Sequence, residues 1–159
     1  MKIRIVCIGK LKEGFYRDAV KEFTKRLSRY SAIEIVELPD EKAGENLSDA
    51  QKKQVRDREG RRILGCLSQS EYLIASDIGG VRFSSEAFAK QLDRIMSGGG
   101  SCIAIAVGGS LGLSREVMDR ANLCVSFSDM TFTHQLFRVI LLEQVYRAFK
   151  IINGEPYHK

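Results

Sequence analysis

Five short runs of apolar and β-branched residues, each followed by a segment with helical periodicity, constrain the fold of this chain most. The runs predict strands over residues 2–8, 33–38, 71–75, 102–107 and 123–127. Regular alternation of strands and helices is typical of an α/β sandwich built on a mostly parallel sheet. The last two runs lack polar alternation, as expected for central strands buried on both faces. We therefore expect a mostly parallel sheet of five to six strands flanked by helices.

Polar and glycine signals mark the ends of the expected helices. Ser114 is expected to cap a short helix to residue 121, and Thr131 or Thr133 to cap the last helix. The glycines at 98–100 end the third helix without steric cost. The expected helices cover residues 15–30, 48–67, 84–98, 114–121 and 134–152.

Length and composition bound the class of protein. A chain of 159 residues with 44% hydrophobic residues is predicted to be one domain, residues 1–159. No apolar run reaches the roughly 18 residues of a membrane span, and the first residues lead straight into a strand, so we expect neither membrane anchor nor signal peptide. The four cysteines form no C-x-x-C pair, which favours reduced thiols in the cytoplasm over disulfides or a metal site.

The charge of the chain favours an anionic partner. The net charge is +5 with a pI of about 9.1. Residues 10–29 hold seven basic and three acidic side chains, and residues 52–62 hold six basic side chains against Asp57 and Glu59. Two basic helices are compatible with an RNA-facing surface, although a solvated face explains them equally simply.

Three strand ends rich in small or polar residues are candidates for a binding site. They are residues 76–80, 108–112 and 128–131, and ligands of open α/β sheets bind beyond the carboxyl ends of strands. A tight strand-to-helix turn also uses glycine for purely local reasons. The segment 9–14 superficially resembles a phosphate loop, but Phe15 and Tyr16 stand where Lys and Ser or Thr belong, so we exclude nucleotide binding there.

The last expected helix is apolar on more than one stripe. Such a helix must be buried on most sides, and a homodimer interface is the simplest way to cover it. Arg138, Glu143 and Arg147 are then expected on its remaining polar strip. His134 at its start and the tail at 154–159 lie near these elements, but a packing histidine and an inert, frayed tail are equally good interpretations.

Several motifs together closely resemble the RlmH family of SPOUT-class RNA methyltransferases. The resemblance runs the full length of the chain and includes residues 1–12 and 39–42. Its specific motifs are IAVGGSLGL at 105–113, SFSDMTFTHQ at 126–135, RVILLEQVYRA at 138–148 and the terminal PYHK at 156–159. The family usually has leucine at Ser76, proline at Thr133 and often lysine at Val81.

The resemblance implies a SPOUT fold with a C-terminal trefoil knot, a homodimer, and S-adenosyl-L-methionine as cofactor. It implies methylation at N3 of a pseudouridine in large-subunit (23S) ribosomal RNA, on the assembled ribosome, without a metal. The tail residues Tyr157 and His158 resemble the family's active-site end. By position, the implied cofactor contacts are Ser76, Gly108, Phe127, Ser128, Asp129, Met130, Thr131 and Phe132.

A mechanism follows from this chemistry as a hypothesis. The imide N3–H must lose its proton, and a histidine with a pKa near 6.5 suits a general base, so we expect His158 in that role and Tyr157 positioning the base. Three alternatives stay open: a non-catalytic ribosome- or RNA-binding module, a different α/β nucleotide enzyme such as a phosphotransferase, and a structural dimerisation protein.

Overall fold

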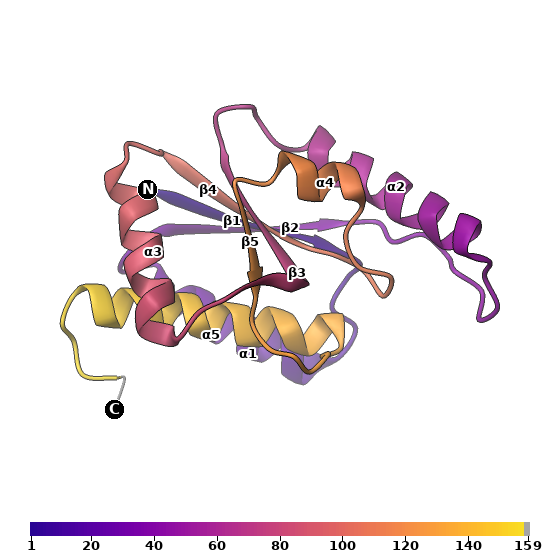
Figure 1. Ribbon diagram of the computed structural model, residues 1–159. Helices are drawn as coiled ribbons and strands as arrows, with labels where there is room; N and C mark the ends of the chain where they lie inside the picture. The colour runs from indigo at the N-terminus through magenta and orange to yellow at the C-terminus, as the bar shows by residue number, and fades with distance from the viewer. Residues whose placement is uncertain (158–159) are drawn as a thin grey trace.

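The strands form one parallel sheet in the order β2-β1-β4-β3-β5 (Figure 1). The structure, a computed structural model, describes residues 1–157. All neighbouring strands pair in parallel, which confirms the α/β fold expected from the sequence. The strands are β1 (Lys2–Ile8), β2 (Ala32–Leu38), β3 (Tyr72–Arg82), β4 (Cys102–Val107) and β5 (Leu123–Ser126).

Helices cover both faces of this sheet. One layer contains α1, α3 and α5, and the other contains α2 and α4 (Figure 1). Side chains of β1 and β4 alternate between the two resulting cores and are buried on both faces, so the absence of polar alternation in β4 has a direct structural reason. The helices are α1 (Gly14–Leu27), α2 (Asp49–Gly65), α3 (Ser85–Ser97), α4 (Arg115–Arg120) and α5 (His134–Ile152).

Side-chain caps fix the starts of the helices that follow strands β2 to β5. Ser48 and Gln51 form a reciprocal capping box at α2. Ser84 caps α3 and Ser114 caps α4 through the backbone N–H three residues on. At α5 the cap is Thr133, whose Oγ1 accepts from Leu136 N at 3.3 Å. Thr133 therefore performs the capping role here, and Thr131 does not.

Strand β3 is longer than the sequence indicates, because it does not end at residue 75. Ser76 and Val81 both pair with Val125 of β5, so residues 77–80 bulge out between two stretches of pairing. Gly80 passes so close to β5 that a Cβ there would lie 2.7 Å from backbone atoms of Cys124 and Val125. The glycines that suggested a loop instead permit this close approach of two backbones.

Helix α5 lies against the sheet between α1 and α3, and all of its residues are buried or half-buried. The prediction that Arg138 belongs to an exposed polar strip is wrong, because its side chain is only 1% exposed. Its guanidinium donates to the carbonyl oxygens of Ile8 and Gly9 at 3.1 and 2.6 Å and pairs with Glu37 at 2.6 Å. Arg138 thus satisfies backbone acceptors that the end of β1 leaves without sheet partners.

Candidate functional site

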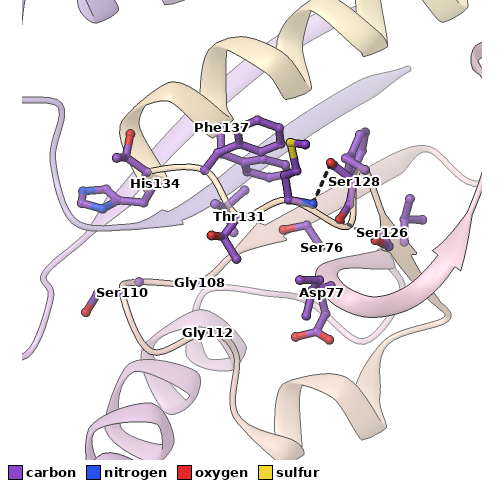
Figure 2. A pocket seen from close by; sticks show the side chains of 18 of the residues that line it. Ser76, Asp77, Gly108, Ser110, Gly112, Ser126, Ser128, Thr131, His134 and Phe137 are labelled. Carbon is purple, nitrogen blue, oxygen red and sulfur yellow. Dashed lines mark hydrogen bonds between the residues drawn. The ribbon is translucent and has the colours of Figure 1, made fainter.

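A cavity of about 800 Å³ opens at the carboxyl edge of the sheet. Figure 2 shows Gly108 and Gly112 on one rim, Ser128 and Thr131 on the other, and Ser76 between them. The cavity is therefore built at the bulge of β3 and where β4 and β5 end, as expected of a ligand site at the carboxyl edge of a parallel sheet. Its lining comes from residues 76–78, the turn at 107–112 and the segment 125–137.

The glycine turn after β4 is tightly folded. A Cβ on Gly108 would lie 2.7 Å from the carbonyl carbon of Gly112 and 2.9 Å from its oxygen. Gly112 adopts a left-handed φ of +82°, and its N–H donates to Gly109 O at 3.1 Å. Any side chain at Gly108 would therefore displace the turn, and the backbone itself forms this wall of the cavity.

The start of the bulge in β3 supplies the floor between the two rims. The Ser76 hydroxyl donates to Ala106 O at 2.9 Å, so this side chain ties β3 to β4. Asp77 Oδ1 accepts from Gly79 N at 2.9 Å, which holds the bulge that brings Asp77 and Ile78 to the cavity. Both residues belong to the strand end at 76–80 that the sequence marks as a candidate binding site, although neither is among the expected cofactor contacts.

The loop after β5 is held by its own side chains and by an aromatic anchor. Ser126 Oγ donates to Ser128 O at 3.2 Å, and Ser128 Oγ accepts from Met130 N at 2.9 Å. The ring of Phe127 packs edge-on against Phe88 and Phe137, with centroid separations of 5.6 and 5.4 Å. This packing anchors the start of the loop in the core beneath α3 and α5.

Seven of the eight expected cofactor residues line the cavity, and Asp129 does not. Asp129 pairs with Arg82 at 2.5 Å on the surface instead. Met130 and Phe132 line the cavity while remaining 76% and 39% exposed. The seven that the structure brings together are Ser76, Gly108, Phe127, Ser128, Met130, Thr131 and Phe132.

His134 also lines the cavity, at the same end as Ser110 (Figure 2). Burial, together with the positive charge of Arg138, lowers the pKa of His134, so its imidazole is neutral at neutral pH. The sequence placed this residue near the strand ends without distinguishing a packing role from a functional one.

The tail residue Tyr157 lies against α5 rather than in the cavity. Its hydroxyl donates to Glu143 Oε1 at 3.2 Å, and its ring lies edge-on to Tyr146 and under the guanidinium of Arg147. Burial and Glu143 raise the pKa of Tyr157, which keeps the phenol protonated. The other predicted catalytic residue, His158, lies outside the described residues.

Helix α2 packs against the outer side of the glycine turn. Glu59 is 4% exposed; its Oε1 accepts from Glu41 N at 3.0 Å, while its Oε2 has no hydrogen-bond partner. A Cβ on Gly109 would lie 3.0 Å from that Oε2, and one on Gly60 would lie 2.8 Å from Ser114 Cβ. Burial raises the pKa of Glu59, and the carboxylates of Asp40 and Glu41 add to this effect.

Residues 1–157 contain no cluster of three or more His, Cys, Asp or Glu that could hold a metal ion. Within the same part of the chain, no helix has the length and apolar character needed to cross a membrane. All four cysteines are free thiols, and burial raises the pKa of Cys7 to about 12.

Comparison with known proteins gives the family. The family described as "Predicted SPOUT methyltransferase" matches residues 1–158. This chain belongs to the SPOUT methyltransferase family. The resemblance noted in the sequence is thereby confirmed at the level of the family.

Curated relatives of this SPOUT protein include the proteins named ribosomal RNA large subunit methyltransferase H from Bacillus thuringiensis (strain Al Hakam) and Bacillus cereus (strain B4264). Each is 55% identical over 159 residues, which is 100% of both chains. The fold is similar to a solved structure described as a probable methylase family protein from Haemophilus influenzae Rd KW20. The TM-score is 0.56 at 12% identity, over 96% of this chain and 66% of that one.

Proposed function

We propose that this SPOUT protein transfers a methyl group from S-adenosyl-L-methionine to N3 of a pseudouridine in large-subunit ribosomal RNA, acting on the assembled ribosome in the cytoplasm. One observation carries the proposal: full-length relatives at 55% identity are named as large-subunit ribosomal RNA methyltransferases. The net charge of +5 fits an RNA substrate. We further propose that residues 1–159 act as one domain with the knotted topology that the resemblance implies.

The cavity suits an adenosine-containing cofactor in size and wall chemistry. Its volume of about 800 Å³ lies within the range of roughly 300–1,000 Å³ typical of small-molecule sites. The wall at Gly108 is bare backbone, held by a turn too tight to accept a Cβ there, and the opposite wall offers the amides and hydroxyls of 126–133. When bound, S-adenosyl-L-methionine supplies an electrophilic methyl group, and this transfer requires no metal.

This chain's residues then have distinct roles. Backbone groups at Gly108 and 127–132 hold and orient the cofactor, and Phe127 anchors that loop through Phe88 and Phe137. We assign removal of the N3 proton to His158 and positioning of the acceptor base to Tyr157. Asp129 acts indirectly in this proposal, because its pairing with Arg82 braces the loop.

The position of Tyr157 favours a homodimer in which the tail serves the partner's cavity. Along α5, Glu143 lies about 14 Å from His134, at about 1.5 Å per residue, so a tail bound at Glu143 is far from its own cavity. Ile78, Val81, Met130 and Phe132 are all exposed apolar side chains at or beside the cavity mouth. A second copy of the chain would cover these side chains and bring its tail to the site.

The test is methylation of ribosomes by full-length protein and by a variant that ends at Pro156. The full-length protein is expected to transfer one methyl group per ribosome. The truncated protein is expected to lose this transfer while it binds S-adenosylhomocysteine within about threefold of full-length protein, since Tyr157 does not line the cavity. Full activity of the truncated protein would refute the assignment of Tyr157 and His158.

A non-catalytic RNA-binding module is the second candidate, favoured by the surface charge alone. Calorimetry with S-adenosyl-L-methionine separates the two candidates, because a pure RNA-binding module shows no binding heat. The phosphotransferase alternative would need a phosphate loop at 9–14. Gly9, with a left-handed φ of +84°, instead lies against the side chains of His134 and Arg138.

A further inference from the structure

The first half of α2 projects beyond the sheet on the side of the cavity. In a parallel sheet the helix that follows β2 begins at the carboxyl edge, and α2 begins at Asp49 after β2 ends at Leu38. Figure 1 shows its N-terminal turns extending past the sheet. The buried residues of α2 are Glu59, Gly60 and Ile63, and all of them belong to its second half. The first half is thus a helical arm without core contacts.

One face of this arm continues the face that packs on the glycine turn. Residues four apart, or seven to eight apart, share a helix face, so Lys52 and Arg56 align with Glu59 and Gly60. Gly60 packs against Ser114, and Glu59 lies against Gly109. At about 1.5 Å per residue, Arg56 lies about 6 Å and Lys52 about 12 Å beyond Gly60 along the helix axis.

Among the residues that the structure describes, no carboxylate neutralises the positive charges of Lys52 and Arg56. Three other cations of α2 have carboxylate partners: Lys53 pairs with Asp57 at 2.6 Å, and Arg58 and Arg62 both pair with Glu41. Within residues 1–157, no side-chain hydrogen bond or ion pair is found for Lys52 or Arg56, although both side chains are only partly exposed.

We propose that Lys52 and Arg56 bind phosphates of the substrate RNA and so hold the strand across the glycine turn at the cavity mouth. The inference rests on the proposed function, and it selects one face of one of the two basic helices. Two unpaired cations on one helix face match the repeated negative charge of a nucleic acid backbone. Arginine can bind a phosphate with two parallel N–H donors, and lysine binds it as a point charge.

The experiment compares two double variants of the full-length protein. The test variant carries Lys52→Gln and Arg56→Gln. The matched control carries Lys90→Gln and Arg94→Gln, an exposed pair with the same four-residue spacing on α3, which lies in the opposite helical layer. Both double variants remove two positive charges, and both replace lysine and arginine with glutamine, which is also a good helix former. Circular dichroism and S-adenosylhomocysteine calorimetry verify that fold and cofactor site are intact.

The test variant is expected to raise the KM for ribosomes about tenfold or more with kcat nearly unchanged, because phosphate contacts add uniform binding. Its plot of log K against log salt for a ribosomal RNA fragment should lose about 1.4 to 1.8 units of slope, for two phosphate contacts at about 0.7 to 0.9 each. The control variant should stay within about twofold of wild type in both measurements.

Three results would overturn the inference. One is a test variant that matches wild type in KM and salt slope. Another is an equal loss of ribosome affinity and salt slope in the α3 control, because the effect would then come from the total charge of the protein and not from the position of the two cations. A third is lower ribosome affinity with an unchanged salt slope for RNA, which indicates contact with a ribosomal protein. If wild type transfers no methyl group at all, the proposed function fails, and the RNA salt slope still decides the role of the two cations.

Discussion

Replacing Gly108 by alanine tests the geometry of the proposed cofactor wall. The added Cβ would lie 2.7 Å from the carbonyl carbon of Gly112 and 2.9 Å from its oxygen, and 3.0 Å from Leu113 N. Ordinary van der Waals contact begins at 3.4 Å, so the first of these distances is 0.7 Å too short. All three atoms belong to the backbone, so the turn itself must move to accept the methyl group.

The expected cost follows from the size of this clash. Overpacking of this kind destabilises a protein by about 1–3 kcal/mol. For a chain of this length, that corresponds to a fall in Tm of about 3–10 °C. A turn displaced by several tenths of an ångström also loses backbone contacts with the ligand, and each 1.4 kcal/mol lost weakens binding about tenfold. We expect Gly108→Ala to weaken S-adenosylhomocysteine binding at least about tenfold.

The assay is isothermal calorimetry with S-adenosylhomocysteine, alongside thermal unfolding. The matched control is Gly65→Ala, because no atom lies within 4 Å of a Cβ at the end of α2. The control should bind normally and be as stable as wild type or slightly more stable. A Gly108→Ala protein with wild-type affinity and wild-type Tm would refute the reasoning, because the turn would then be neither rigid nor part of the site.

Two further substitutions test the supports of the site by denaturant unfolding. Arg138→Met should cost about 3–5 kcal/mol, because it leaves the carboxylate of Glu37 and the carbonyls of Ile8 and Gly9 without their donor. The control Arg115→Met, which removes a solvent-exposed ion pair with Asp119, should leave the free energy of unfolding close to that of wild type. The pKa of Glu59 is higher in the folded protein than in the unfolded chain. The contribution of this carboxyl group to stability is therefore fully present below the unfolded pKa and is lost as the pH rises through the folded pKa. Glu59→Gln should therefore gain stability relative to wild type as the pH rises above the unfolded pKa of about 4.3. A stability difference that does not change with pH would contradict the unpaired buried carboxylate.

Elements with strong local signals were predicted well from the sequence. β4 has the predicted bounds, and α5 begins at His134 and ends at Ile152 as expected. The capping serines Ser48, Ser84 and Ser114 mark their helices because a side-chain oxygen satisfies backbone donors there. These features depend on residues close in the sequence, which explains why pattern and propensity were sufficient.

Features that depend on distant residues were missed. The continuation of β3 depends on β5, whose Val125 pairs with both Ser76 and Val81. The local pattern places Arg138 on the polar strip of α5, but its guanidinium is buried because it donates to the carbonyls of Ile8 and Gly9. Asp129 belongs to a motif whose other residues line the cavity, but Arg82 holds it on the surface. In each case a tertiary contact overrides the local pattern.

The most direct test of the proposed function is mass spectrometry of large-subunit ribosomal RNA from cells with and without this gene. The account predicts one pseudouridine that carries an N3-methyl group in the first sample and lacks it in the second. Purified full-length protein and S-adenosyl-L-methionine should restore the mark on ribosomes from the second. Identical RNA in both samples would contradict the account.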